Sequence, residues 1–248
     1  ILFESFWPLH LSAAFLEMFR VVIQLGAILA VCVVFFSRLN PFDSGKNRSE
    51  KQETWDIWKK VIIGCLPAGV LGLAANNYMD AHFYKWQVVA VTLIVYGVAF
   101  ILIENKNAHT RPAIRSFGRL SYKTAVLIGL FQCLSLVPGT SRSGATILGA
   151  MILGVSRTVA AEYSFFMAIP IMLGASLVKL VKYGLHFTGS ELFVLFLGMA
   201  VAFAVSLFVV RFLMNFIRQY SFKIFGYYRI ILGAVVILIA LIAPGVLP

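Results

Sequence analysis

The sequence of 248 residues is 60% hydrophobic and only 12% charged, with a mean hydropathy of +0.91. A soluble domain carries about 25% charged residues, and a disordered chain is poor in aromatic and aliphatic residues. The apolar stretches are continuous over about 18 residues or more, whereas a membrane β-barrel shows short alternating segments. The composition therefore excludes these three classes and predicts an all-α polytopic membrane protein.

The net charge of +11 does not indicate a nucleic-acid partner. The basic residues lie in the links between apolar segments, which is the arrangement that the positive-inside rule describes. Cys32, Cys65 and Cys133 lie in apolar segments without a metal-binding spacing, so we expect them to be inert packed thiols.

Six segments are long and apolar enough to cross a membrane. In chain order they cover about 12–36, 61–81, 86–103, 158–181, 191–210 and 227–247. The polar links 37–60, 104–123 and 211–226 are the predicted cytoplasmic loops. The segment 124–157 is also apolar, but PGTSRSG at 138–144 interrupts it, and neither half is long enough to cross. We therefore expect one integral membrane domain, 1–248, with about six transmembrane helices and a broken hairpin.

Most of the 21 Lys and Arg residues gather on one side of these spans. They lie in the three links and, just beyond them, at Arg157 and Arg229. The opposite side carries only Lys85, Lys179 and Lys182. This bias places the first set in the cytoplasm and the C-terminus outside. The bias holds only if 124–157 enters and leaves on the same side, which predicts a re-entrant helix–loop–helix.

A weak internal repeat accompanies this topology. The segment 25–29 (LGAIL) resembles 173–177 (LGASL), and the two predicted spans run in opposite directions. Inverted repeats of this kind build a site near the membrane midplane from broken helices. We predict a first repeat over 1–103 and a second over 124–248. The same offset places the partner of the loop 138–146 before residue 1, so we expect the first repeat to be truncated at its start.

The loop 138–146 (PGTSRSGAT) is the main chemical signal. An arginine at membrane depth costs at least about 2.5–3.5 kcal/mol, so Arg142 predicts an anionic partner or a water-filled cavity. Gly139 and Gly144 let backbone N–H groups approach a ligand, and a helix starting near Gly144 aims its amides at that ligand. These features describe a phosphate cradle. The alternative is a Gly/Ser hinge in which Arg142 pairs with a carboxylate.

Two carboxylates and one amide also lie inside predicted spans. For Glu17 we favour an ion pair with Arg20 on the same helix face, and for Glu162 a position at the membrane surface. Gln24 lies deeper, where a role in the site and a helix–helix hydrogen bond are both open. No histidine lies near the loop 138–146.

Three segments resemble the bacitracin-resistance family of undecaprenyl-diphosphate phosphatases: 22–26 (VIQLG), 131–134 (FQCL) and 138–146. The resemblance covers essentially the whole chain, and the Pro-Gly-x-Ser-Arg-Ser-x-x-Thr motif is highly specific. It implies a bacterial inner-membrane hydrolase that removes the terminal phosphate of undecaprenyl diphosphate at a site accessible from the outer face. That activity recycles the lipid carrier for peptidoglycan synthesis and gives bacitracin resistance. The implied fold has six crossing helices and two re-entrant hairpins.

The resemblance also assigns roles to matching positions. The implied catalytic residues are Arg142, Ser141 and Ser143, and either serine is a candidate nucleophile. The implied diphosphate-binding set is Gly139, Thr140, Gly144, Thr146 and Gln24.

A divalent cation, Mg or Ca, is implied as well. The family's Glu-x-x-x-Glu helix and Pro-x-Ser-Ser-Thr-Gly-His segment do not occur in this sequence. We therefore expect no metal ligand in this chain and place the carboxylate ligands upstream of Ile1.

The expected partners are a polyprenyl diphosphate and membrane lipids, and a homodimer is left open. The alternative function is an inverted-repeat transporter or flippase for a phosphate or a phospholipid, because re-entrant loops also build transporters. A non-catalytic membrane scaffold is the third hypothesis. Paired glutamates and a histidine in the upstream stretch would favour hydrolysis over transport.

Overall fold

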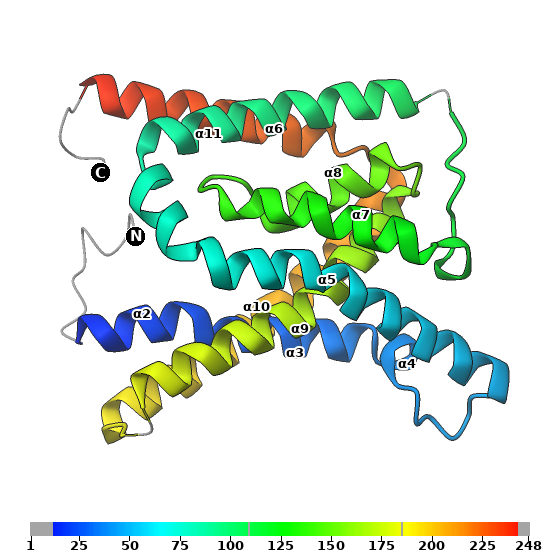
Figure 1. The fold of residues 1–248 in the computed structure, drawn as a ribbon, viewed down its shortest axis with the longest axis horizontal. Coiled ribbons are helices and arrows are strands. Elements are labelled where there is room, and N and C mark those ends of the chain that lie inside the picture. Colours follow the sequence, from blue (N-terminus) through cyan, green and yellow to red (C-terminus); the bar gives the residue numbers. More distant parts are fainter. Residues whose placement is uncertain (1–11, 109, 185, 243–248) are drawn as a thin grey trace. The chain divides into compact units, whose positions relative to one another are not determined.

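The computed structural model describes residues 12–108, 110–184 and 186–242, except for the side chains of 76–81. Figure 1 shows that helices make up almost all of this part of the chain, and no strand occurs in it. The α-helices are α2 (Ala13–Val22), α3 (Gln24–Val34), α4 (Phe36–Leu39), α5 (Arg48–Phe83), α6 (Trp86–Asn107), α7 (Tyr122–Cys133), α8 (Arg142–Ile152), α9 (Arg157–Tyr183), α10 (Gly189–Gln219) and α11 (Lys223–Ile242).

Six helical segments among the described residues are long and apolar enough to cross a membrane. They are Ala13–Val34, Arg48–Ala75, Trp86–Asn107, Arg157–Tyr183, Gly189–Gln219 and Lys223–Ile242. Each contains or overlaps one of the six predicted spans. The prediction of an all-α polytopic membrane protein is therefore confirmed.

Two predicted loops are shorter than expected. Helix α5 begins at Arg48, where Asn47 and Glu50 cap each other reciprocally. It therefore includes Lys60, whose Nζ donates to the Phe117 carbonyl at 2.9 Å. Helix α10 continues to Gln219, so most of 211–226 is helical as well. Hydropathy locates where a helix leaves the apolar layer, but lysine and arginine are good helix formers, so the helix itself continues.

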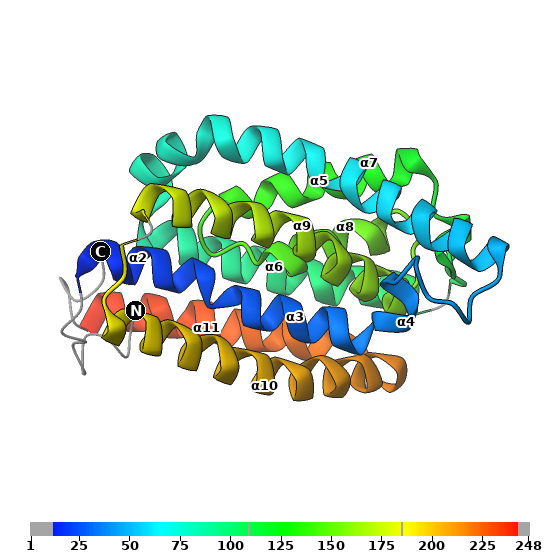
Figure 2. The same cartoon turned by 90° about the horizontal axis from the view of Figure 1, so that it is seen from below.

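The described chain forms two compact units. The first comprises residues 12–36 and 168–212, and the second comprises 37–167 and 213–242. In the first unit Phe15, Met18, Val22 and Leu195 are buried together. Figure 2 shows α10 running alongside α2 and α3.

The proposed internal repeat stays a prediction. Both matching segments lie in the first unit, but their glycines are used differently. A Cβ on Gly26 would lie 2.2 Å from the Met199 carbonyl oxygen, so Gly26 permits a close helix crossing. A Cβ on Gly174 would meet nothing within 4 Å.

The second unit contains the α7–α8 hairpin. Helix α7 packs on α5, α8 packs on α7 and α6, and α6 packs along α11. Figure 1 shows the hairpin lying between α5 and the α6–α11 pair. Glycines bring α6 and α11 together, because a Cβ on Gly97 would lie 2.7 Å from the Gly226 carbonyl oxygen.

The hairpin returns to the end where it starts. Helices α7 and α8 have 12 and 11 residues, which makes each about 17 Å long and too short for a core of about 30 Å. The link before α7 is bonded to the link after α8: Ile114 N–H donates to the Gly154 carbonyl at 3.1 Å, and Ser156 N–H donates to the Ile114 carbonyl at 2.8 Å. These bonds confirm the predicted helix–loop–helix hairpin, and its re-entrant course in the membrane stays a prediction.

Candidate active site

The tip of the hairpin is the loop between α7 and α8. Gly139 has a φ of +82°, in the left-handed region that favours glycine. A Cβ at this position would lie 2.2 Å from Thr92 Oγ1 and 2.7 Å from Val89 Cα. The loop is thus pressed against α6 so closely that only a glycine fits.

The first turn of α8 presents the features expected of an anion site. Ser141 is its N-cap, and its hydroxyl accepts the Gly144 N–H at 3.2 Å. The hydroxyls of Ser141 and Ser143 lie 3.2 Å apart. The first N–H groups of a helix have no partner within the helix, and they stabilise a negative charge that lies close to the helix N-terminus.

Arg142 is the first residue of α8 and has a mostly buried side chain. Its Nη1 is buried without a hydrogen-bond partner, and none of the ion pairs among the described residues involves it. Its electrostatic neighbour is the thiol of Cys65 on α5, which itself donates to the Met167 carbonyl at 3.4 Å. The hinge alternative requires a carboxylate beside Arg142, so this arrangement favours an anionic ligand.

Thr140 and Thr146 are both buried, at 9% and 1% exposure. The Thr146 hydroxyl lies 3.1 Å from the Arg142 carbonyl oxygen and 2.7 Å from the Ser164 hydroxyl. The contact between Thr146 and Ser164 therefore links α8 to α9. Its role as a phosphate ligand stays a prediction.

Gln24 lies in the first unit, at the break between α2 and α3. Its side-chain amide donates to the Arg20 carbonyl at 3.1 Å, one turn earlier in the chain. This local bond leaves its role as a diphosphate ligand a prediction.

Two carboxylates have ion-pair partners that are distant in the sequence. Glu17 pairs with Lys179 of α9, and not with Arg20 as expected. Glu162 is buried and pairs with Arg38, and its position at the membrane surface stays a prediction.

Arg229 is a residue of this region that the sequence analysis misplaced. The charge count puts it among the cytoplasmic basic residues, but it lies within α11 at 8% exposure. Its Nη2 donates to the Gly139 carbonyl at 2.9 Å. The signal that could have found it is its position between Gly226 and Gly233, because small residues at this spacing mark the packed face of a membrane helix.

Two residues of α6 support the loop: Thr92 contacts it directly, and Tyr96 packs against Arg229. The Thr92 hydroxyl lies 3.0 Å from the Pro138 carbonyl oxygen, and it is also within hydrogen-bond distance of the Val88 and Val89 carbonyls of its own helix. The guanidinium of Arg229 lies over the ring of Tyr96, with 5.5 Å between its carbon and the ring centroid. Residues of α6 and α11 therefore contact the carbonyl groups of Pro138 and Gly139 in the loop.

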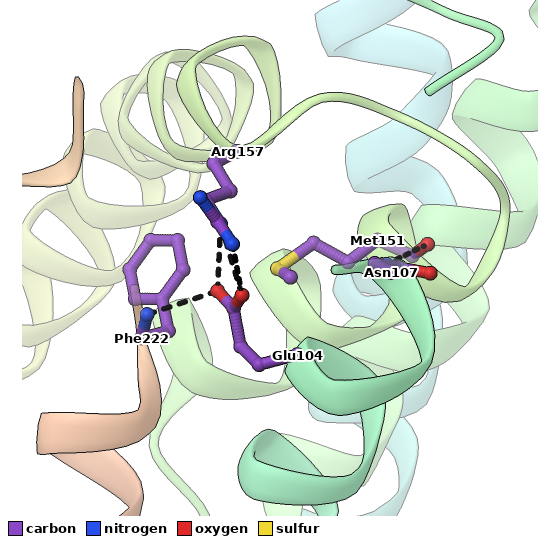
Figure 3. A network of polar contacts seen from close by, with 5 residues as sticks. All are labelled: Glu104, Asn107, Met151, Arg157 and Phe222. Atoms are coloured by element: carbon purple, nitrogen blue, oxygen red, sulfur yellow. Dashed lines mark hydrogen bonds and ion pairs between the residues drawn. The ribbon is translucent and has the colours of Figure 1, made fainter. Parts of the chain in front are cut away.

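A buried network holds the open end of the hairpin (Figure 3). Glu104 of α6 has a fully buried carboxylate that accepts the Nε–H of Arg157 at 2.9 and 3.0 Å. The same carboxylate accepts the N–H of Phe222 at 2.9 Å, and the Asn107 side chain donates to the Met151 carbonyl at 3.4 Å. The network joins the end of α6 to the start of α9, the segment before α11 and the end of α8.

A cavity of about 460 Å³ lies in the second unit, among the links that precede α5 and α7. Arg38 and Glu162 on its wall form an ion pair, and the Nζ of Lys46 donates to the Thr54 hydroxyl at 2.9 Å. These charged groups already have partners, so we assign the cavity no ligand.

The fold is that of a polytopic membrane protein in which a helix–loop–helix hairpin carries Arg142, Ser141 and Ser143 at its tip. The sequence profile of the family described as bacitracin resistance protein BacA matches residues 1–235. The chain belongs to this family.

Similar proteins from three bacteria carry the name undecaprenyl-diphosphatase. The chain is 54% identical over 239 residues to the protein of Desulfitobacterium hafniense, covering 96% of this chain and 86% of that protein. It is 53% identical over 245 residues to a protein of Enterococcus faecalis, covering 98% and 88%. It is 54% identical over 238 residues to the protein of Acetivibrio thermocellus, covering 96% and 88%.

Proposed function

We propose that this protein hydrolyses undecaprenyl diphosphate to undecaprenyl phosphate and inorganic phosphate. The observation that carries the proposal is the buried guanidinium of Arg142, which has no carboxylate partner and stands at the N-terminus of α8. Membership of the BacA family and the names of the relatives supply the substrate. The product would serve again as the lipid carrier for cell-wall synthesis, and the activity would give bacitracin resistance.

The chemistry follows from charge and position. Phosphoryl transfer depends mostly on holding the phosphate in place and neutralising the charge that develops on its oxygens. A guanidinium suits this task because it donates two parallel N–H groups to phosphate oxygens. In the proposal Arg142 and the first amides of α8 bind the terminal phosphate.

The reaction exchanges one phosphorus–oxygen bond for another. The bond from the terminal phosphorus to the bridging oxygen breaks, and undecaprenyl phosphate leaves. In the direct route the new bond forms to the oxygen of water. In the serine route it forms first to the hydroxyl oxygen of Ser141 or Ser143, and water then breaks this phosphoserine bond and releases inorganic phosphate. The proton lost by the attacking hydroxyl or water goes to solvent in either route. Both hydroxyls lie at the start of α8, so both remain candidate nucleophiles.

The proposed site opens to the outer face of the bacterial inner membrane. The loop contacts Val89 and Thr92, in the first two turns of α6, which begins at Trp86. In the predicted topology this end of α6 faces outward, and so does the C-terminus. The lipid tail of the substrate would lie between helices and reach the bilayer.

A divalent cation, Mg or Ca, is part of the proposal. Among the described residues no group of three or more His, Cys, Asp or Glu side chains could hold it. None of the roles given above to Arg142 and the serines depends on the ion.

Phosphate release in detergent tests the proposal. The wild-type protein should release phosphate from undecaprenyl diphosphate, and Arg142→Ala should be at least about a hundredfold slower, as for other groups that stabilise developing charge. Arg111→Ala, which removes an exposed arginine of the link before α7, should not change the rate. Equal release by wild type and Arg142→Ala would overturn the proposal, and movement of intact lipid without phosphate release would support the transporter instead.

A further inference from the structure

We infer that Arg229 is a positioning residue, which holds the phosphate-binding loop in its active shape. The inference rests on the proposed function. Arg229 lies more than eighty positions beyond the loop in the sequence, on α11, and reaches it through one hydrogen bond of 2.9 Å to the Gly139 carbonyl. Packing over Tyr96 fixes the direction of the side chain.

The burial of Arg229 needs a reason. A guanidinium inside a membrane helix costs at least about 2.5–3.5 kcal/mol, yet none of the ion pairs among the described residues involves Arg229. Its Nε is buried without a hydrogen-bond partner. A neutral side chain could hold α11 against the hairpin at a lower desolvation cost. We therefore attribute the presence of a charged side chain to its hydrogen bond with the loop.

The guanidinium lies against the start of α8. A Cβ on Gly144 would be only 3.7 Å from the Nη1 of Arg229. The hydrogen bond from Arg229 therefore acts directly beside the first turn of α8, where the proposal places the phosphate.

The hydrogen bond controls the direction of a carbonyl group. Carbonyl oxygens repel phosphate oxygens, so a cradle needs the carbonyl groups of its loop turned away from the ligand. Arg229 holds the Gly139 carbonyl toward α11. The Thr92 hydroxyl is a weaker tether, because its one proton is shared between the Pro138 carbonyl and the Val88 and Val89 carbonyls of α6. With the Gly139 carbonyl held, Arg142 and the two serines at the start of α8 keep a fixed position.

The consequence is catalytic rather than only structural. A displacement of about 1 Å in a catalytic group can cost about a hundredfold in rate. Loss of a positioning residue lowers kcat and leaves KM almost unchanged, because the substrate still binds but the transition state is poorly stabilised. A purely structural role would lower the melting temperature without changing kcat per folded molecule.

The experiment measures phosphate release by folded protein, purified by size exclusion in detergent, for wild type and three variants. Arg229→Gln should lower kcat about ten- to a hundredfold with KM within about threefold. Arg229→Lys, which keeps the charge and can still donate an N–H to the Gly139 carbonyl, should stay within about fivefold of the wild-type kcat. Thr92→Val, which removes the second tether at constant volume, should lower kcat about three- to tenfold. Arg111→Gln is the control for loss of an exposed positive charge.

The outcomes separate the inference from the proposed function. Absence of phosphate release from the wild type in the presence of Mg or Ca overturns the proposed function. An active wild type with a fully active Arg229→Gln, or with a raised KM at unchanged kcat, overturns the inference alone. If Arg229→Gln does not fold, the kcat of Thr92→Val is the test. A wild-type kcat in that variant would overturn the claim that hydrogen bonds to the loop carbonyls position the catalytic groups.

Discussion

Replacement of Gly139 by alanine tests whether the contact between the loop and α6 positions the site. The added Cβ would lie 2.2 Å from Thr92 Oγ1 and 2.7 Å from Val89 Cα, whereas ordinary contact begins at 3.4 Å. The loop must therefore move by about 1 Å, because the backbone of α6 cannot yield as a side chain does. The left-handed φ costs alanine about 1–2 kcal/mol, and overpacking costs about 1–3 kcal/mol more.

The expected result is a folded protein with a defective site. A shift of about 1 Å should lower kcat/KM for undecaprenyl diphosphate about a hundredfold. The assay is phosphate release per folded molecule after size exclusion. Gly184→Ala is the matched control, because Gly184 has a φ of +89° but a Cβ there would meet nothing within 4 Å. If Gly139→Ala retained an activity within threefold of Gly184→Ala, the placement of the loop would have no bearing on catalysis.

Three further predictions concern stability and metal. Glu104→Gln should lower the free energy of unfolding by about 1.5–3 kcal/mol, because it removes charge-assisted hydrogen bonds to Arg157, whose side chain is 38% exposed and therefore still partly solvated. Glu17→Gln should cost less than about 1 kcal/mol, because that carboxylate is 68% exposed. Equal shifts in the melting temperatures of Glu104→Gln and Glu17→Gln in detergent would contradict this prediction. Ser141→Ala should lower stability by about 1 kcal/mol through loss of the α8 cap, and Ser143→Ala should not; thermal melts that rank them the other way would refute this. A chelator should abolish phosphate release and Mg or Ca should restore it, so full activity in chelator would exclude the cation.

The six spans and the turn of the hairpin could be predicted because hydropathy and charge are additive along the chain, whereas the side of the membrane on which each loop lies stays a prediction. A span needs about 18 apolar residues wherever it occurs, and basic residues accumulate on one side. Both rules require the segment 124–157 to turn back, and the bonds from Ile114 to Gly154 and Ser156 confirm the turn. The motif at 138–146 is likewise local, so its place at the start of α8 could be anticipated.

The partners of buried charges could not be predicted in the same way. Glu162 pairs with a residue 124 positions away, and Glu17 with one 162 positions away. Reasoning along one helix considers only neighbours three or four residues apart. Arg229 was misplaced for a related reason, because counting charges near the end of a span does not reveal which helix packs against it.

Binding of a hydrolysis-resistant polyprenyl methylenediphosphonate tests the central claim most directly, since it measures recognition of the diphosphate without turnover. The account places Arg142 in contact with the phosphate, so the Kd of Arg142→Ala in detergent should rise at least about tenfold relative to wild type, or about 1.4 kcal/mol. The Kd of Arg111→Ala, which lacks an exposed arginine, should stay at the wild-type value. Equal affinities of wild type and Arg142→Ala would contradict the claim that this buried guanidinium holds the diphosphate.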